Sequence, residues 1–400
     1  MKITKIETIR APEHPNLLWV HIHTDEGIVG LGETTPRVMG PETIIHDVLA
    51  DILLGQNPLD IEKIWHDLYQ SVHYHGYAGA EMRAISAIDM ALWDILGKYT
   101  GQPLYRLLGG KCRESIQIYN TCVSHGEYND WEMSMAEPGK LAESLLADGI
   151  SAMKIWPFDE FSVKTRGQSI SNEDLKRGVA IIKEIRDTVG DRMEIALEGH
   201  SCWNLPSAIR IAKAVEPYGV MWLEDLITSD NAGSLKELKN ATSTPMCVSE
   251  RLFSRFQYVP ILEQRAADII MPDICWVGGF SEIKKIATLA SAYQLPVAPH
   301  NCGGPVQTFA YSHFAASTEN VMIVETVRAF YNSYYEVLVT EQPLIQNGQL
   351  FVTDTPGIGT ELAPALLKRP DLIRRESEVK QATVGWTSGD PWKGGVGEKF

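Results

Sequence analysis

Ionisable side chains follow one another at nearly constant intervals through the middle of this 400-residue chain. Each ends, or closely follows, a short run rich in Val, Ile and Met. They are Glu198, Glu224, Glu250, Asp273, His300 and Glu325. The intervals are 26, 26, 23, 27 and 25 residues, which is close to the length of one strand-plus-helix unit. The spacing therefore predicts one polar side chain at the carboxyl end of each successive parallel strand, where barrel enzymes keep their active sites.

Three consecutive carboxylates in this series predict a metal site. A single polar residue at a strand end would be explained simply by its contact with water. Glu198, Glu224 and Glu250 together would repel one another at close range unless a cation lay among them. Carboxylate oxygens completed by water suit the octahedral coordination of Mg²⁺ and do not favour Zn²⁺ or copper. We expect these three glutamates to bind one Mg²⁺ ion.

Two histidines are candidates for proton transfer. His300 follows an apolar run, and Asp273 lies one run earlier at the same level, so this carboxylate could orient the imidazole and raise its basicity. His200 lies two residues past Glu198, and side chains at i and i+2 of a strand point to the same side. Either histidine alone could be a structural hydrogen-bonding residue. Their attachment to the carboxylate series favours catalysis.

Eight apolar runs, alternating with amphipathic segments, would position these side chains. The alternation is typical of strand–helix units around a buried parallel sheet. Eight units over about 215 residues match a (β/α)₈ barrel, and the chain is assigned to the α/β class. The runs are IQIYNTCV, SAMKIW, MEIALE, VMWLE, MCVSE, DIIMPD, LPVAPH and VMIVE.

A smaller α+β unit precedes the barrel. Residues 3–10 and 18–24 alternate apolar and polar positions, and 29–33 could add a third strand. Residues 42–109 have helical periodicity, and their last helix ends at Gly97 or Gly101.

The division of the chain follows from this change of pattern. We predict boundaries at 1–112 for the α+β unit, 113–334 for the barrel and 335–400 for a C-terminal segment. That last segment contains a possible hairpin (QNGQLFV) and a Gly/Trp-rich tail from about residue 384. It is expected to return to the first unit or to trail off it.

Composition excludes several classes of protein. With 51 acidic and 36 basic residues the net charge is −15, and no basic stripe could neutralise nucleic-acid phosphates. The sequence has no apolar run of membrane-spanning length, and its N-terminus is charged where a signal peptide would be apolar, so we expect a cytoplasmic protein. The six cysteines lack metal-site spacing and are expected to be reduced.

The joint order of these residues resembles the enolase superfamily, mandelate racemase subgroup. The resemblance includes AISAIDMALWDILGK followed by PLYRLLGG (84–110), then Lys154, the three glutamates, Asp273 with His300, and Glu325. It implies a barrel capped by the α+β unit together with C-terminal residues. It also implies a mechanism in which a Lys or His base removes a proton next to a carboxylate while Mg²⁺ stabilises the ene-diolate, which is the described chemistry of that superfamily. In the helix of the motif, Arg83, Asp89, Trp93 and Asp94 are expected to be structural.

Two departures from the subgroup pattern narrow the expected reaction. Racemases of the subgroup carry K-x-K at the second strand, whereas here Lys154 is followed two residues later by Trp156. The Glu198-Gly199-His200 element is similar to that of the galactonate and mannonate dehydratases, in which this histidine is an acid. The resemblance therefore implies a sugar-acid dehydratase that forms a 2-keto-3-deoxy acid. Lys154 would supply a second cation, and Glu325, if protonated, would donate a hydrogen bond to the substrate carboxylate.

Substrate selection is expected from the cap and the loops beside the mouth. Trp156, Tyr74 and His75 are candidate substrate-binding residues beside Lys154, although aromatic residues at these positions could equally be ordinary core packing. By resemblance alone we expect a homo-oligomer that acts on a small-molecule sugar acid.

Two alternatives remain open at this stage. A racemase, epimerase or cycloisomerase would use the same ene-diolate with a different outcome. A non-catalytic barrel could bind an acidic sugar for sensing, although the presence of Asp273, His300 and Glu325 together argues against that.

Overall fold

Three antiparallel strands open the chain, as the alternating pattern predicts. They are β1 (Ile3–Arg10), β2 (Leu18–Thr24) and β3 (Val29–Thr34). In the computed structural model, which describes residues 1–379, the C-terminal strand β13 (Ile373–Glu378) pairs with β1 and completes the order β13-β1-β2-β3. The C-terminal segment thus returns to the N-terminal unit. The predicted Gly/Trp-rich tail lies outside the described residues.

Helix α4 (Ala80–Thr100) covers one face of this sheet. Gly30 and Gly32 of β3 allow the close approach, because a Cβ at these positions would lie 2.1 Å and 1.9 Å from the carbonyl oxygens of Ala91 and Ala87. The helix ends at Gly101, whose φ of 66° lies in the left-handed region that glycine tolerates. The other helices of this unit are α1 (Met39–Ile44), a π-helical turn (Ile45–Leu49), α2 (Ala50–Leu53), α3 (Ile61–His73) and α5 (Leu104–Leu107).

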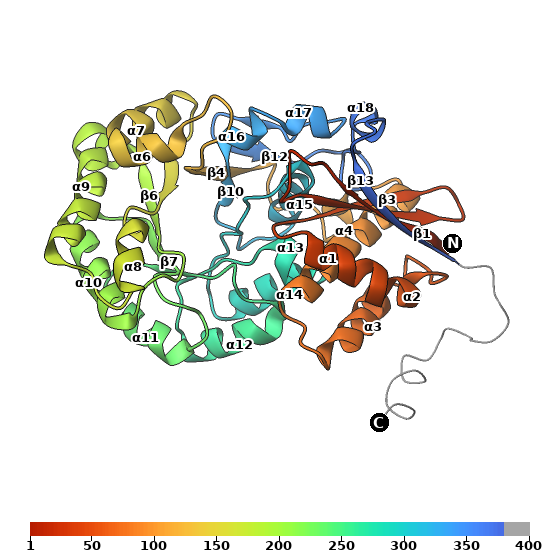
Figure 1. Cartoon of the computed structure of the whole chain (residues 1–400), viewed down its shortest axis with the longest axis horizontal. Helices are drawn as coiled ribbons and strands as arrows, with labels where there is room; N and C mark the ends of the chain where they lie inside the picture. The colour runs from red at the N-terminus through yellow and green to blue at the C-terminus, as the bar shows by residue number, and fades with distance from the viewer. Residues whose placement is uncertain (380–400) are drawn as a thin grey trace.

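A closed ring of parallel strands forms the barrel beside the cap (Figure 1). Its named strands are β4 (Ser115–Thr121), β5 (Ala152–Ile155), β6 (Glu194–Glu198), β7 (Trp222–Glu224), β8 (Met246–Val248), β9 (Ile269–Ile270) and β10 (Val324–Thr326). They pair in chain order, and β10 pairs with β4 to close the ring. The predicted (β/α)₈ architecture is confirmed.

The seventh run, LPVAPH, is shorter than a strand in the structure. Val297 alone bridges Ile270 on one side and Val321 on the other. Pro296 and Pro299 explain this reduction, because proline has no N–H to donate to a ladder.

Helices and a C-terminal hairpin surround the ring. The hairpin joins β11 (Ile345–Gln346) to β12 (Gln349–Phe351) through Asn347 and Gly348, both with positive φ, as QNGQLFV predicts. The longer helices are α6 (Asp130–Ala136), α7 (Pro138–Ala147), α8 (Asp159–Thr165), α9 (Asn172–Val189), α10 (Leu205–Val215), α11 (Ala232–Asn240), α12 (Ser254–Gln264), α14 (Gly279–Ala292) and α15 (Pro305–Ala316). Short turns of helix are α13 (Ile274–Val277), α16 (Arg328–Tyr331), α17 (Tyr335–Leu338) and α18 (Pro364–Leu367).

Direct hydrogen bonds join the cap to the barrel. Trp276 Nε1 donates to the Thr35 carbonyl at 2.6 Å, and Trp93 Nε1 donates to Ser281 Oγ at 2.9 Å. Asp89 accepts from the Ser281 backbone N–H at 3.1 Å. These contacts hold the cap against the βα loops after β9.

Two further findings concern the cysteines and the lengths of the helices. All six cysteines lie within the described residues and none forms a disulfide. Across residues 1–379, no helix combines the length and the apolar character needed to cross a membrane.

Candidate active site

The three glutamates of the predicted metal site lie at the carboxyl ends of adjacent strands. Glu198 ends β6 and Glu224 ends β7, and the two are directly paired in the ladder. Glu250 lies two residues beyond β8. All three side chains are buried. Burial raises the pKa of Glu198 to about 7 and raises that of Glu224 well above its usual value, so unneutralised negative charge is costly here.

Two basic side chains contact this cluster. Arg251 Nε lies 3.3 Å from Glu250 Oε1, and Lys154, near the end of β5, contacts the other two glutamates. Its Nζ lies 2.6 Å from Glu224 Oε1, 2.9 Å from Glu325 Oε1 and 3.4 Å from Glu198 Oε2. Burial alone would lower the pKa of this lysine, but the surrounding carboxylates outweigh burial and raise it well above its usual value. Lys154 is therefore a permanent cation in contact with three strand-end carboxylates.

Two further oxygens at this end of the barrel lack partners. Glu250 Oε2 and Asp225 Oδ1 are buried and have no hydrogen-bond partner within the described part of the chain. Unpaired buried carboxylate oxygens are expensive and are suited to a metal ion. The donor set thus fits Mg²⁺. However, Glu198, Glu224 and Glu250 do not form a group whose ligand atoms all lie within 4.8 Å of one another among the described residues.

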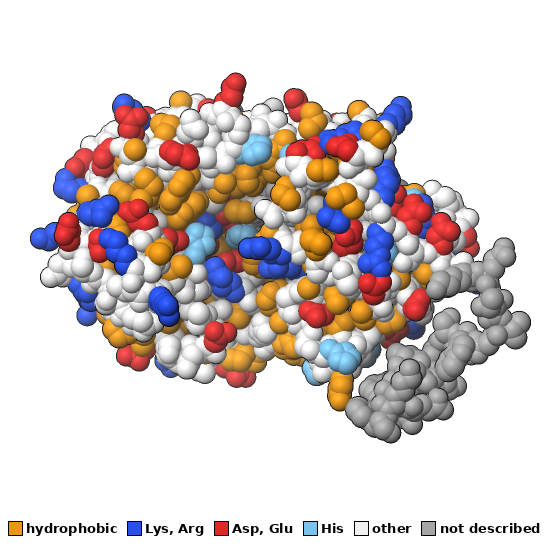
Figure 2. All heavy atoms as spheres, in the orientation of Figure 1, with side chains coloured by type: hydrophobic (Ala, Val, Ile, Leu, Met, Phe, Trp, Pro, Cys, Tyr) orange, Lys and Arg blue, Asp and Glu red, His pale blue; other side chains and the backbone are white. Residues whose placement is uncertain are grey.

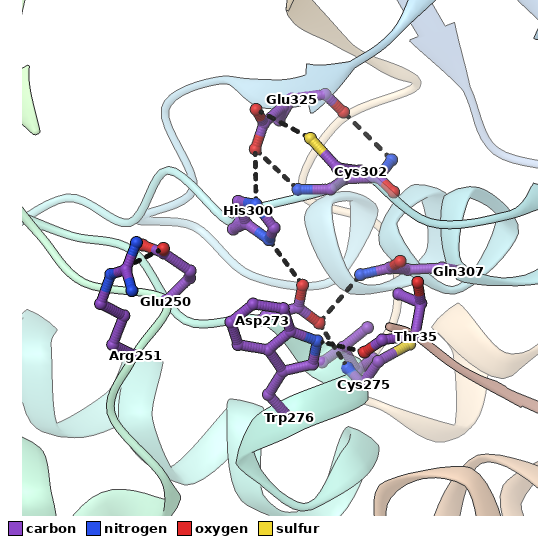
Figure 3. A network of polar contacts seen from close by, with 12 residues as sticks. Thr35, Glu250, Arg251, Asp273, Cys275, Trp276, His300, Cys302, Gln307 and Glu325 are labelled. Atoms are coloured by element: carbon purple, nitrogen blue, oxygen red, sulfur yellow. Dashed lines mark hydrogen bonds and ion pairs between the residues drawn. The ribbon is translucent and has the colours of Figure 1, made fainter. Parts of the chain in front are cut away.

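His300 and Asp273 form the predicted pair (Figure 3). His300 Nδ1 donates to Asp273 Oδ2 at 2.6 Å. The other oxygen, Asp273 Oδ1, accepts from the Cys275 N–H at 2.7 Å and from Gln307 Nε2 at 2.9 Å. The carboxylate is therefore held from both sides, and it orients the imidazole so that Nε2 lies 3.9 Å from Glu325 Oε2.

The pKa of His300 reflects its acidic surroundings. Burial lowers it, but the nearby Glu325 carboxylate and the hydrogen bond to Asp273 outweigh burial and raise it well above the usual value. In the metal-free protein the imidazole is thus protonated at neutral pH, and it must lose its Nε2 proton before it can accept one from a substrate.

The charge of Glu325 depends on the cations beside it. Burial raises its pKa, but Lys154 and His300 outweigh burial and lower it to about 2. Its oxygens accept from the Asn301 N–H at 2.8 Å, from the Thr121 hydroxyl and from Lys154. In the metal-free protein Glu325 is therefore ionised, because Lys154 and His300 lie beside it. Its role as a hydrogen-bond donor to the substrate carboxylate stays a prediction.

His200 reaches the site by a turn and not by strand alternation. Strand β6 ends at Glu198, and His200 has a φ of 44°, in the left-handed region. Its backbone N–H donates to Glu198 Oε1 at 2.7 Å, and its Nδ1 lies 2.5 Å from Asp159 Oδ2. The side chain is 41% exposed. The premise that residues 198 and 200 share a strand face is wrong. The backbone of His200 contacts Glu198, and its ring contacts Asp159.

Of the candidate substrate-binding residues beside Lys154, only Trp156 lies against the site. It stacks on Trp131 with ring centroids 4.6 Å apart and meets His200 edge-on at 5.5 Å. Tyr74 is 86% exposed and contacts His75, which is also exposed. Both follow the end of α3, whose apolar side faces the cap core, so they point toward solvent. Within residues 1–379, neither side chain forms a hydrogen bond or ion pair with the carboxylates.

A hollow opens on the face of the molecule above the barrel strands (Figure 2). Histidine and basic side chains gather in and around it. A cleft of about 570 Å³ lies beside the site and runs between cap and barrel. Ser201 and Arg251 line it on the barrel side, and Ala78 lines it on the cap side.

The sequence did not single out four residues that lie at the site, namely Asp159, Asp225, Arg251 and Cys302. Asp225 accepts from the Ser249 hydroxyl and lies 3.5 Å from Arg251 Nε. Cys302 Sγ lies 3.5 Å from Glu325 Oε1. Asp159 contacts His200. Asp225 directly follows Glu224, so strand alternation predicts that its side chain points away from the barrel centre, and the periodic pattern carried no signal for it.

Comparison with family models agrees with this geometry. Residues 7–109 match the mandelate racemase / muconate lactonizing enzyme N-terminal domain, and residues 138–366 match the enolase C-terminal domain-like family. Together these models cover most of the chain.

Individual relatives are similar over almost their whole length. A D-xylonate dehydratase of Haloferax volcanii is 34% identical, over 90% of this chain and 87% of its own. A D-galactonate dehydratase of Pectobacterium atrosepticum is 33% identical, over 92% of this chain and 94% of its own. The crystal structure of an enolase of the mandelate racemase subgroup from Agrobacterium tumefaciens is 46% identical, with a TM-score of 0.88 over 95% of this chain and 99% of that one. The chain is an enzyme that belongs to the enolase superfamily, in its mandelate racemase subgroup.

Proposed function

We propose that this enzyme is a Mg²⁺-dependent dehydratase that converts a sugar acid into a 2-keto-3-deoxy acid. Two kinds of observation support the proposal. The relatives that share a third of its sequence are named as D-xylonate and D-galactonate dehydratases. The chain also carries two imidazoles at one carboxylate cluster, one for each proton transfer that dehydration requires.

The base in this proposal is His300. Its Nδ1–H is held by Asp273, which leaves Nε2 as the nitrogen that accepts the α-proton of the substrate. Proton transfer by a positioned side chain contributes typically about 10²- to 10⁴-fold to rate.

The negative charge that forms on the substrate carboxylate needs cations. Lys154 supplies one from the end of β5, and Glu325 keeps that ammonium in place. Bound by Glu198, Glu224 and Glu250, Mg²⁺ would supply Lewis-acid stabilisation of the same charge.

The acid in this proposal is His200, which Asp159 holds through Nδ1. The imidazolium gives its proton to the β-hydroxyl as the C–O bond breaks, and the electron pair left by the α-proton forms the C=C bond. Water departs, and the enol product tautomerises to the 2-keto-3-deoxy acid. His300 carries the proton removed from the α-carbon and His200 becomes neutral, so the proton balance closes.

One connected arrangement carries the proposal. The His200 backbone N–H contacts Glu198, His300 Nε2 faces Glu325, and Lys154 contacts both of these carboxylates. Acid and base are thus held by separate aspartates but belong to the same cluster.

The decisive experiment assays keto-acid formation across a panel of aldonates and sugar diacids with Mg²⁺, including D-xylonate and D-galactonate, with detection by semicarbazide. We expect at least one substrate to give a 2-keto-3-deoxy product and to exchange its α-proton in D₂O. His300→Asn should abolish both. Exchange that persists in that variant would remove His300 as the base.

The same assay separates the rival reactions. A racemase, epimerase or cycloisomerase would give α-proton exchange without a keto acid. Trp156 stands where the subgroup racemases have their second lysine, which disfavours two-base racemisation. Binding of Mg²⁺ without exchange on any panel member would favour a non-catalytic sugar-acid sensor. Four other expectations stay predictions. They are substrate contacts by Tyr74 and His75, domain boundaries at 112/113 and 334/335, a homo-oligomer and a cytoplasmic location.

A further inference from the structure

A second group of metal-ligating side chains lies in the cap, away from the barrel cluster. Glu7 of β1 and His21 of β2 are directly paired across the two strands, and His23 lies two residues along β2 on the same face. This face is opposite to the one that α4 covers. Glu7 and His21 are buried, and His23 is partly buried. In the described part of the chain, their ligand atoms all lie within 4.8 Å of one another.

The separations within this group are too long for hydrogen bonds. Glu7 Oε2 lies 3.6 Å from His21 Nδ1 and 3.5 Å from His23 Nε2. His23 Nε2 is buried and has no hydrogen-bond partner among residues 1–379. Ligands about 2.0–2.1 Å from a tetrahedral zinc ion stand about 3.3–3.4 Å from one another. The observed distances are therefore close to the edges of a zinc coordination tetrahedron.

The remaining contacts of Glu7 orient it toward the imidazoles. Arg374 Nη1 of β13 lies 2.5 Å from Glu7 Oε1 and so leaves Oε2 for the histidine side. On the same sheet face Lys5 pairs with Glu376 at 3.1 Å. The charges of the basic and acidic side chains around the group are thus neutralised in pairs. A carboxylate ligand that is also held by an outer hydrogen bond is a common feature of metal sites.

We propose that Glu7 Oε2, His21 Nδ1 and His23 Nε2 bind a Zn²⁺ ion that joins β1 to β2, with water as the fourth ligand. Two imidazole nitrogens and one carboxylate favour a borderline ion such as Zn²⁺, whereas the all-carboxylate barrel site favours Mg²⁺. The cap site is structural: through Arg374 it also stabilises the pairing of the C-terminal strand with β1. It is independent of the proposed reaction.

The test titrates Zn²⁺ into the full-length protein in a large excess of Mg²⁺, which occupies the carboxylate site, against a chromogenic zinc chelator. The variants are His21→Gln and His23→Gln, and the matched control is His66→Gln, an exposed histidine on α3. Loss of an outer-sphere partner costs about 10- to 100-fold in metal affinity, so loss of a ligand should cost at least that much. We expect both variants to lose one equivalent of Zn²⁺ that the control and the unaltered protein retain. Equal stoichiometry and affinity in all four proteins would overturn the site.

A second measurement does not depend on the folding of any variant. Hydrogen exchange of the unaltered protein, with and without Zn²⁺ in excess Mg²⁺, should show slower exchange confined to β1, β2 and β13. Protection only around the barrel cluster, or none at all, would overturn the proposal. Because Glu7, His21 and His23 lie outside the barrel cluster, Mg²⁺-dependent turnover by the two variants should equal that of the control.

Discussion

The imidazole of His200 lies 2.5 Å, Nδ1 to Oδ2, from the carboxylate of Asp159, a residue 41 positions earlier in the chain. Asp159 begins α8, in the connection after β5, and His200 lies in the turn after β6. A carboxylate at Nδ1 fixes the orientation of the ring and leaves Nε2 as the nitrogen that can face a substrate.

Asp159→Asn should therefore slow dehydration far more than α-proton exchange. A positioned proton donor is typically worth about 10²- to 10⁴-fold, and loss of its orienting partner should remove a substantial part of this. The measurement compares keto-acid formation with deuterium incorporation for one substrate. The control is Glu160→Gln, an exposed neighbour whose one ion pair among the described residues is with Arg177. An equal fall in both rates would contradict the positioning role of Asp159.

Lys154→Met should destabilise the fold strongly at neutral pH in the absence of Mg²⁺. The substitution leaves Glu198, Glu224 and Glu325 buried without their shared cation, and breaking a buried ion pair costs about 3–5 kcal/mol. Urea unfolding measures the loss. The matched control is Lys63→Met, which removes an exposed pair with Asp67 and should cost less than about 1 kcal/mol. Similar losses in the two variants would show that the buried cluster does not depend on Lys154.

Removal of divalent metal should lower the melting temperature, and Mg²⁺ should restore it. At a free concentration about 100 times its Kd, a ligand that binds only the folded state adds about 2.7 kcal/mol. Glu250→Gln should abolish this response, because it replaces a buried carboxylate whose Oε2 has no hydrogen-bond partner among the described residues. Glu263→Gln, an exposed substitution at the end of α12, should retain it. An equal Mg²⁺ response in both variants would exclude Glu250 as a ligand.

His313 should make the protein less stable as the pH falls from about 6.5 to 4. It is buried in α15, where it accepts from the Tyr105 N–H at 3.3 Å and contacts the Ile358 carbonyl at 3.0 Å. Burial lowers its pKa to about 4 from the usual 6.5. Between these values the unfolded chain binds a proton that the folded one does not, so the free energy of unfolding falls with pH, by about 3 kcal/mol in total.

The check for His313 is urea unfolding at several pH values. His313→Gln should flatten the decline between pH 6.5 and 4 relative to the unaltered protein, whereas His66→Gln, on the exposed side of α3, should not. Parallel pH profiles for all three proteins would exclude His313 as the group responsible.

The order of the polar residues along the chain was enough to predict the barrel and the strand ends at which the candidate site residues lie. The reason is physical: each strand–helix unit spans a similar length, so Glu198 and Glu224 recur at equivalent strand ends and become ladder partners. The first two cap strands were equally predictable, because their sequences alternate apolar and polar residues, although most of their side chains are buried. The hairpin at Asn347 and Gly348 followed from local turn chemistry alone.

Contacts between side chains from distant segments could be found only in the folded chain. Neither Asp159 beside His200 nor Arg374 beside Glu7, 367 residues away, leaves a periodic signal. The positive φ at His200 and Asp225 turns their side chains in directions that strand alternation does not predict. The charge state of Glu325 likewise depends on Lys154 and His300, which reach it from two other strand ends. Periodicity assigns a residue to a face of its own element, whereas pairing, burial and pKa depend on what the other elements bring against that face.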